Sequence, residues 1–374
     1  MNKIEKLLNE LCPNGVEFKS LGEVCEVVKG QQLNKNLLLE SGLYPVMNGG
    51  INPSGYWDTY NKNAQTITIS QGGASAGYVN FMQTPFWAGA HCYTIEKVVE
   101  FLNYKFVYYF LKNNQNNLIK SQYGAGIPAL NKTDIQNLQI PIPPLKIQEE
   151  IVKILDAFTE LEAELEAELE ARRRQYEYYR NKLLSFEYLK TNGGGYKLKM
   201  LGEVCEIYDK LRKPVAKDKR VKGDYPYYGA NGIQDYVNNY LFEGEYLLIG
   251  EDGSVINKDN SPVLHFVNGK FWVNNHAHII QSKNHNLRFI YYALQCCNIF
   301  DLVKGTPPKL NQENLKIIQI PIPPLEVQEK IVSILDKFHA LTTDLQSGIP
   351  AEIEARKKQY EYYRNQLLTF KEAI

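Results

Sequence analysis

The chain is one unit written twice, and this internal repeat constrains the fold more than any other feature of the sequence. Three segments recur unchanged: Leu21–Glu26 as Leu201–Glu206, Gln139–Leu145 as Gln319–Leu325, and Gln175–Asn181 as Gln359–Asn365. The first two pairs lie 180 positions apart and the third lies 184 apart. A fold for this chain must therefore hold two equivalent modules, with four extra residues in the second helical region.

The two copies differ most in the part that precedes a pair of prolines. After Pro143-Pro144 and Pro323-Pro324 the copies are nearly the same, whereas before them only a skeleton is shared. Its members are Tyr44-Pro45 with Tyr225-Pro226, Phe86-Trp87 with Phe271-Trp272, His91 with His276, and Leu130-Asn131 with Leu310-Asn311. A constant scaffold that carries two dissimilar heads indicates two different targets recognised at a fixed separation.

The heads have the pattern of mixed α/β domains. Short β-type runs such as Gln65–Ile69 and Tyr246–Ile249 are bounded by Gly, Asn and Pro. Each head also offers one helical segment, Tyr104–Leu111 in the first and Leu287–Leu294 in the second. We therefore predict strands and one packed helix in each head.

The region after each proline pair has the apolar spacing of a coiled-coil helix. The seam residues are Ile151, Ile154, Phe158, Leu161 and Leu165 in the first copy, and Val327, Ile331, Ile334, Phe338, Leu341 and Leu345 in the second. The first helix is predicted to continue to about Phe186. The second contains Gly348-Ile349-Pro350, which should break it, with Pro350 near the start of a new segment.

These patterns divide the chain into heads at 1–144 and 191–324 and spacer helices at 145–190 and 325–374. Chain order makes the two helices antiparallel if their seams pack together. The predicted fold is therefore two pseudo-repeated mixed α/β (α+β) domains, joined by long antiparallel coiled-coil helices with approximate two-fold symmetry. The alternative is that each helix packs only on its own head.

Composition limits the class of protein. Formal net charge is zero, with 42 Lys plus Arg and 42 Asp plus Glu. Neutrality disfavours a free-standing DNA-binding protein, but it permits DNA binding by part of the surface. There is no run of about 18 apolar residues, so no membrane span is expected. The six cysteines include no CxxC pair, and reduced thiols in the cytoplasm are expected.

Three doubled motifs connect the chain with a known family. They are the Pro-Ile-Pro-Pro-Leu-x-x-Gln-Glu entry, the Ile-x-x-Ile-Leu-Asp helix and the Tyr-Glu-Tyr-Tyr-Arg exit, each present twice in the same order. With these motifs, essentially the whole chain resembles the specificity subunits of type I restriction-modification enzymes. The resemblance implies two target-recognition domains, 1–144 and 191–324, each recognising half of a split, asymmetric site on double-stranded DNA.

The resemblance also implies which chemistry belongs to partners. The chain would be no enzyme itself and would bind no cofactor or metal. Two methyltransferase subunits would methylate adenine with S-adenosylmethionine. Two restriction subunits, where present, would use ATP and Mg²⁺. The alternative is a two-headed coiled-coil adaptor that binds proteins and never meets DNA.

Candidate DNA contacts follow from the donors that phosphates and base edges require. The stretch from Asp209 to Gly223 is the most basic of the chain, and its candidates are Lys210, Arg212, Lys213, Lys217, Lys219 and Arg220. The equivalent stretch of the first head is less basic, and its candidates are Lys29, Gln31, Gln32 and Lys35. Further candidates are Gln71 and Ser75 in a Gly-rich turn, and Gln122, Tyr123, Lys304, Thr306 and Lys309 before the final strands. For each candidate the alternative is an ordinary solvated loop residue.

Candidate partner contacts lie near the ends of the helices, since tyrosine and arginine favour interfaces. They are Tyr178, Tyr179, Arg180, Tyr362, Tyr363 and Arg364. Helix-pair packing is the favoured interpretation for the neighbouring Tyr176 and Tyr360.

The first helix contains a tandem tract, in which Glu160-Leu161-Glu162-Ala163 is followed by two more copies that end at Ala171. One copy is about one helical turn, or about 6 Å, against about 3.4 Å per base pair of duplex DNA. We hypothesise that the number of copies sets the length of the unread DNA spacer. A solvated acidic helix face is the plainer interpretation.

Several catalytic signatures are missing from the sequence. There is no GxxxxGK[ST] loop, no Asn-Pro-Pro-aromatic motif and no convincing acidic-acidic-Lys nuclease cluster. His276 and His278 have the spacing of a metal pair, but no Cys or carboxylate partner is evident nearby. Packed or hydrogen-bonded histidines are therefore expected.

Overall fold

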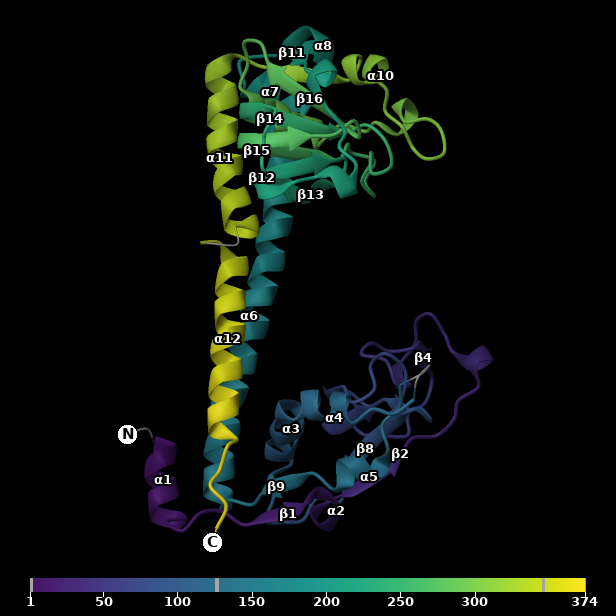
Figure 1. Cartoon of the computed structure of the whole chain (residues 1–374), viewed down its shortest axis with the longest axis vertical. Helices are drawn as coiled ribbons and strands as arrows, with labels where there is room; N and C mark the ends of the chain where they lie inside the picture. The colour runs from purple at the N-terminus through teal and green to yellow at the C-terminus, as the bar shows by residue number, and fades with distance from the viewer. Residues whose placement is uncertain (1–2, 125–127, 345–346, 374) are drawn as a thin grey trace. The chain divides into compact units, whose positions relative to one another are not determined.

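The computed structural model describes residues 3–124, 128–344 and 347–373. The chain forms two compact units, of which unit 1 comprises 1–166 with 353–374, and unit 2 comprises 167–352 (Figure 1). Each unit contains one head and parts of the long helices. The division into heads and spacers at residues 144, 190 and 324 stays a prediction.

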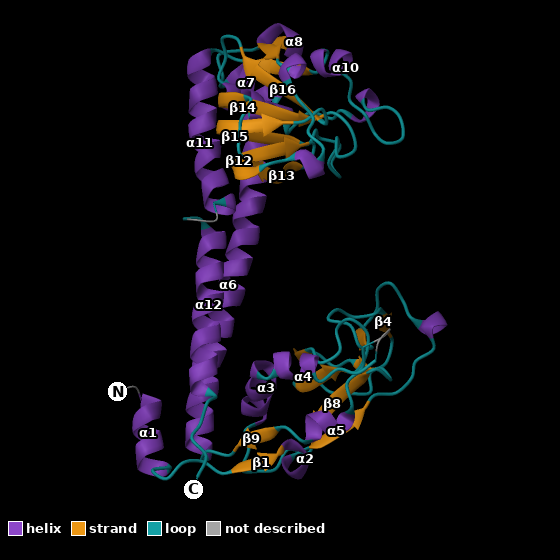
Figure 2. Ribbon diagram, viewed as in Figure 1, coloured by secondary structure: helices purple, strands orange, loops and turns teal. Residues whose placement is uncertain are grey.

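The head of unit 1 contains both helices and short strands (Figure 2). Its four-stranded antiparallel sheet has the order β2-β8-β5-β6, beside a three-stranded sheet β4-β3-β7 and a two-stranded pair β1-β9. Its elements are α1 (Lys3–Leu11), β1 (Phe18–Ser20), α2 (Leu21–Val24), β2 (Glu26–Lys29), η1 (Lys35–Leu37), β3 (Tyr44–Met47), β4 (Tyr56–Trp57), β5 (Thr66–Ser70), β6 (Val79–Met82), β7 (Trp87–Ala88), β8 (Cys92–Glu96), α3 (Tyr104–Asn113), α4 (Gln115–Lys120), α5 (Lys132–Gln136) and β9 (Gln139–Pro141).

Unit 2 repeats this plan with longer strands. One six-stranded sheet has the order β11-β16-β14-β15-β12-β13, and β10 pairs with β17. The elements are α7 (Phe186–Thr191), β10 (Lys197–Met200), α8 (Leu201–Val204), β11 (Cys205–Ile207), η2 (Asp209–Leu211), η3 (Lys217–Lys219), β12 (Lys222–Gly229), β13 (Gly232–Val237), β14 (Phe242–Gly250), β15 (Leu264–Val273), β16 (Ala277–Ser282), α9 (Leu287–Leu294), η4 (Phe300–Leu302), α10 (Gln312–Lys316) and β17 (Gln319–Ile322).

The predicted head helices and strands are confirmed. α3 begins after Asn103, whose side chain accepts hydrogen bonds from two backbone N–H groups of the first turn, and α9 begins after Asn286, whose side chain accepts one hydrogen bond, from Phe289 N. The buried face of α3 includes Phe106, Val107 and Phe110, which join the apolar core of unit 1. The predicted runs in the heads lie within β5 and β14 or overlap them.

The long helices are α6 (Leu145–Leu183), α11 (Leu325–Thr343) and α12 (Ile349–Leu367). The predicted break at Gly348-Ile349-Pro350 is confirmed, with Pro350 in the first turn of α12. α6 ends three residues before Phe186, because Ser185 caps the separate helix α7. The predicted seam residue Leu345 lies outside the described residues.

The helices pair antiparallel inside each unit. In unit 1, Phe158 stacks on Tyr363 with ring centroids 5.6 Å apart, and Lys357 pairs with Glu162 at 3.3 Å. In unit 2, Tyr179 stacks on Phe338 at 5.3 Å. Positions further along α6 therefore contact earlier positions of the partner helix, as in an antiparallel pair. The alternative that each helix packs only on its own head is wrong.

Two side chains fasten each head to its helix. The Gln148 side chain is fully buried, accepts from Asn103 N at 2.7 Å, and donates to Phe101 O at 3.0 Å and Pro143 O at 2.6 Å. Asp156, two turns further on, accepts from the Tyr109 hydroxyl at 2.6 Å. In unit 2, Gln328 and Asp336 occupy the same places against α9.

Candidate nucleic-acid interface

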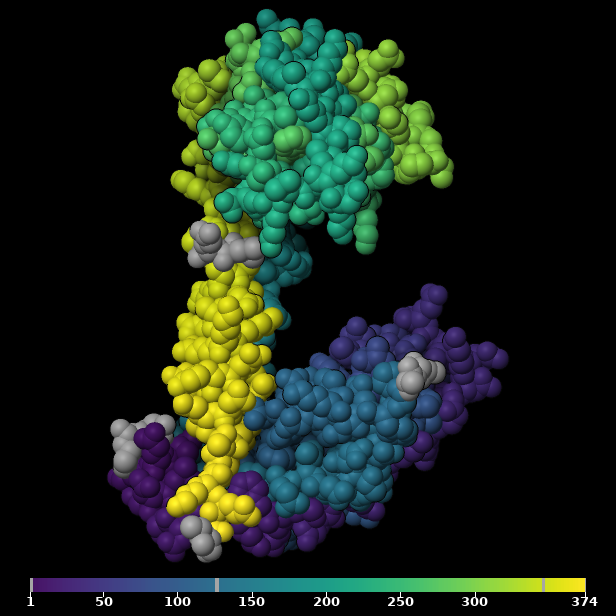
Figure 3. All heavy atoms as spheres, viewed as in Figure 1, coloured from purple at the N-terminus to yellow at the C-terminus, as the bar shows by residue number. Residues whose placement is uncertain are grey.

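Three loops meet at one edge of the unit 2 sheet. They are residues 208–221 after β11, the turn 251–254 after β14, and the hairpin 304–309. In the hairpin, Lys304 and Lys309 exchange two backbone hydrogen bonds of 2.9 and 2.8 Å. Gly253 N donates to Pro308 O at 3.0 Å, so the hairpin is tied to the turn. Within this unit the loops lie on the side of the sheet away from α11, and the hairpin projects from the surface in yellow-green (Figures 1 and 3).

The first head builds the same edge from different residues. Tyr123 and Ala129 exchange two backbone hydrogen bonds of 2.9 Å each. Gly73 N donates to Pro128 O at 2.9 Å. The loop after β2, the Gly-rich turn after β5 and the segment around Tyr123 are therefore equivalent to the three loops of the second head.

A tryptophan holds the first loop of each head in place. The indole Nε1 of Trp87 donates to Gln31 O at 3.1 Å, and that of Trp272 donates to Lys213 O at 2.6 Å. The anchor is constant while the loop sequence differs. The sequence marked both tryptophans as shared skeleton, but nothing in it indicated which backbone atom they hold.

Most candidates in the basic loop are free to meet a ligand. The side chains of Lys210, Lys213, Lys217 and Lys219 are exposed, and none has an ion-pair partner among the described residues. Lys304, at the base of the hairpin, and Thr306, in its turn, are exposed. In the first head Lys29, Gln31, Gln32 and Lys35 are exposed as well.

The side chains of two arginines in the same loop are engaged in contacts inside the head. Arg212 pairs with Glu251, donates to Ala277 O at 2.7 Å, and leaves 13% of its side chain exposed. Arg220 pairs with Asp235 at 3.3 Å and lies over the Tyr227 ring at 4.2 Å. DNA contacts by these arginines stay a prediction, but the structure gives both a bracing role that the sequence did not indicate.

The polar candidates of the first head are partly engaged as well. Gln122 Nε2 donates to Ala76 O at 2.5 Å. Gln71 and Ser75 are half-buried in the Gly-rich turn, and Tyr123 is 50% exposed. Of these, Tyr123 is the most accessible side chain.

The expectation that no carboxylate lies near the histidines is wrong. His278 is buried, with Nδ1 2.6 Å from Asp209 Oδ2 and Nε2 2.7 Å from Leu310 O, and His276 pairs with Asp252. The fold brings these carboxylates in from distant parts of the chain. The expectation of a hydrogen-bonded histidine is confirmed.

Asp209, Glu251 and His278 form the one side-chain group in the described parts of the chain that could hold a metal ion. Arg212 and Lys309 already neutralise this group, and both His278 nitrogens have partners. Burial would raise the pKa of Asp209, but its hydrogen bond and charge interaction with His278 lower that pKa overall. The cluster is therefore a closed ion-pair network.

The candidate partner residues occupy equivalent places in the two units. Tyr178 and Tyr362 are each 58% exposed, while Tyr179 and Tyr363 stack on seam phenylalanines. Arg180 bonds Gln295 and Arg364 bonds Asn113. The predicted packing of Tyr176 and Tyr360 between the helices is confirmed, since Tyr360 lies 6.1 Å from Phe158 and Tyr176 lies 6.3 Å from His339, measured between ring centroids. Both tyrosines also pack against the cores of the heads.

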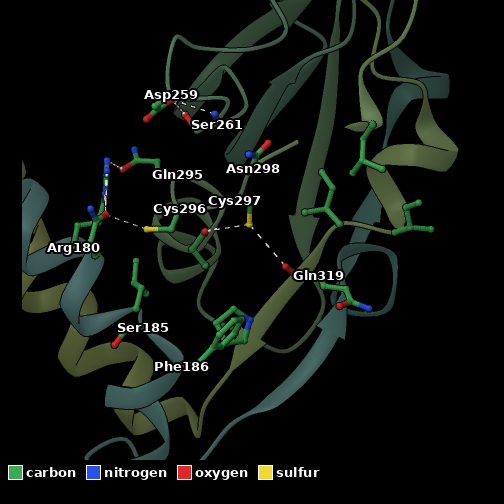
Figure 4. A pocket seen from close by; sticks show the side chains of 17 residues that line it. Arg180, Ser185, Phe186, Asp259, Ser261, Gln295, Cys296, Cys297, Asn298 and Gln319 are labelled. Atoms are coloured by element: carbon green, nitrogen blue, oxygen red, sulfur yellow. Dashed lines mark hydrogen bonds between the residues drawn. The ribbon is translucent and has the colours of Figure 1, made fainter. Parts of the chain in front are cut away.

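A cavity of about 800 Å³ lies beside Arg180 in unit 2 (Figure 4). The end of α6, the end of α9 and β17 form its walls, and Cys296 and Cys297 line it. Burial raises the pKa of Cys297 to about 12 and also raises that of Cys296, so both remain thiols at neutral pH.

The described helices include none long and apolar enough to cross a membrane.

Comparison with known proteins identifies the family. The model for the type I restriction modification DNA specificity domain matches residues 13–171 and 194–355, once in each repeat. The chain belongs to the type I restriction-modification DNA specificity family.

Relatives match along most of the chain. A putative type I restriction enzyme specificity subunit from Haemophilus influenzae is 46% identical and covers 98% of both chains. The EcoR124I/EcoR124II specificity subunit from Escherichia coli is 31% identical over 71% of this chain and 70% of its own length.

Solved structures support the fold. The type I S subunit from M. genitalium superposes with a TM-score of 0.62 at 22% identity, covering 94% of this chain and 95% of its own. A chain from a study of type I assembly and conformational transition gives 0.56 at 18% identity, covering 95% and 98%. The mixed helix-and-sheet heads and the paired helices are thereby confirmed as the family fold.

Proposed function

We propose that this chain is the DNA-recognition subunit of a type I restriction-modification enzyme, and that each head recognises one half of a bipartite, asymmetric site. One observation carries the proposal: both heads present the same three loops from the same scaffold, but with different side chains. Loops at equivalent positions would contact DNA in the same way in both heads, whereas their different side chains would select different bases. Nothing in the chain favours the protein-only adaptor.

The chemistry of the enzyme is assigned to partners. We propose that the chain performs no catalytic step and that methyltransferase subunits bring S-adenosylmethionine for adenine methylation. Two such subunits are expected, because the exposed Tyr178 surface recurs at Tyr362. Restriction subunits would add ATP- and Mg²⁺-dependent cleavage, and the assembly would act on DNA in the cytoplasm.

Co-expression with the cognate methyltransferase tests this function directly. Sequencing of methylated bases in the host genome should find a single bipartite motif with a fixed spacer. The native mass of the purified complex should equal one copy of this chain plus two methyltransferases. A stable complex without any methylated motif would contradict the proposal, and so would a motif without two parts.

A further inference from the structure

One carboxylate joins two of the loops at the edge of the second head. Glu251 Oε2 pairs with Arg212, which belongs to the loop 208–221, and Glu251 Oε1 lies 3.4 Å from Lys309 Nζ, at the end of the hairpin 304–309. The Glu251 side chain is only 14% exposed. Solvent screens the charges of this half-buried group less than those of a surface pair, and loss of one partner would leave the remaining charges uncompensated.

The network continues below Glu251. Leu310 O can only accept, so His278 Nε2 donates to it at 2.7 Å. Asp209 accepts from Ile279 N at 3.0 Å and from Gln312 Nε2 at 3.2 Å, besides its 2.6 Å contact with His278 Nδ1. These partners come from the basic loop, β16, the hairpin end and α10, so all of them are fixed against one another.

The first head has uncharged side chains at the equivalent positions. Gln71 takes the place of Glu251, since Gln71 N donates to His91 O as Glu251 N donates to His276 O, each at 2.9 Å. Tyr93 takes the place of His278, because its hydroxyl donates to Leu130 O at 3.4 Å. The two positions are therefore retained in both heads, but the buried side-chain oxygen of Gln71 has no hydrogen-bond partner among the residues that the structure describes, and the charged bridge is specific to the second head.

We propose that Glu251 is a positioning residue for recognition of the second half-site. It holds the loop of Arg212 and the hairpin of Lys309 as one DNA-facing surface, and Arg212 acts through Glu251 and not on DNA directly. This inference rests on the proposed function and adds a specificity-determining residue that carries no positive charge.

A double-mutant cycle in the complex with methyltransferase tests the inference. Glu251→Gln and Arg212→Met should each weaken binding to a duplex with the cognate site by about tenfold, and the double variant should be no weaker than either alone. Neither should change the slope of log K against log salt, because no phosphate contact is removed. Glu243→Gln, the same substitution on the exposed end of β14, is the matched control and should leave binding unchanged.

Hydrogen–deuterium exchange separates positioning from folding. Exchange in Glu251→Gln should rise in 209–213 and 304–309 and stay unchanged in β14, β15 and β16. A rise throughout the sheet, or none at all, would overturn the proposal. Additive losses in the cycle, or a salt slope lowered by about 1 in Arg212→Met, would make Arg212 a direct contact. If the unaltered complex binds no bipartite site, the proposed function fails instead.

Discussion

The Gln148 side chain satisfies three backbone groups of the first head. Gln148→Ala would leave Asn103 N–H, Phe101 O and Pro143 O without this partner. Because a buried polar group that loses its partner costs about 1–3 kcal/mol, and of the three bonds only the one to Pro143 O is fully buried, we expect the free energy of unfolding to fall by about 1–3 kcal/mol. Urea unfolding followed by circular dichroism measures the loss. Glu149→Ala, at the exposed neighbouring position, is the control, and an equal loss there would contradict the prediction.

We expect His339 to make the stability of unit 2 sensitive to acid. Burial lowers its pKa, which Arg288 lowers further, while Asp336 opposes the shift; the rings of Tyr176, Tyr291 and Tyr292 lie around it. In the unfolded chain the group binds a proton near its ordinary pKa of about 6.5, whereas the folded state resists the proton. The stabilisation is therefore present above about pH 6.5 and is lost as pH falls below it.

His339→Phe should remove most of this dependence. Melting temperatures measured from pH 7.5 to pH 5 should fall less steeply in the variant than in the unaltered protein. His285, whose pKa burial also lowers, leaves a residual slope in both. Parallel curves would show that His339 does not contribute.

Single residues also show where sequence analysis stops. The pairing of His278 with Asp209 and of Arg212 with Glu251 joins positions 69 and 39 residues apart, and no local pattern encodes such contacts. The sequence correctly marked the loop as basic. It could not distinguish the exposed lysines from the arginines that brace the loop.

At the scale of elements, local periodicity was sufficient for helices and weak for loops. The seam spacing and the Gly-Ile-Pro break predicted α6, α11 and α12 closely, because helix contacts lie three and four residues apart. The strands of the heads were predicted only in part, since sheet order depends on partners far along the chain. β12 and β15, for example, pair parallel across more than thirty intervening residues.

The basic loop should dominate the salt dependence of the second head. Lys210, Lys217 and Lys219 are exposed and unpaired within the described residues. Replacing all three by Gln should lower the slope of log K against log salt by up to about 2.7, at about 0.9 for each phosphate contact. Fluorescence anisotropy of a labelled duplex at several salt concentrations measures this. The same replacement of Lys190, Lys197 and Lys199, on α7 and β10, should leave the slope unchanged.

At the scale of the whole molecule, the tandem tract in α6 is the feature that bears on DNA geometry. Residues 160–171 lie entirely inside the continuous helix Leu145–Leu183. Deleting Glu164–Ala167 removes about one turn and about 6 Å. We expect both halves of the methylated motif to persist and the spacer to shorten by one or two base pairs, at about 3.4 Å each.

Methylome sequencing gives the result, and a length-preserving control isolates the cause. Replacing the same four residues by alanines keeps the helix and should keep the spacer. α11 and α12 contain no such tract. An unchanged spacer in the deletion variant would therefore show that a feature other than the tract sets the separation of the heads.

The hydrogen bonds of Gln148 and Gln328 to the backbones of the heads have a consequence for how such proteins diversify. Each glutamine binds main-chain atoms; every residue supplies the carbonyl oxygens, and every residue except proline supplies the N–H donor. A head from another protein with the same backbone conformation could therefore replace the native head at the prolines and still form these hydrogen bonds with the glutamine. Apart from the tyrosine hydroxyls that Asp156 and Asp336 bind, these contacts do not depend on the side chains of the head, so new DNA specificities can arise by recombination of whole cassettes without a redesign of the scaffold.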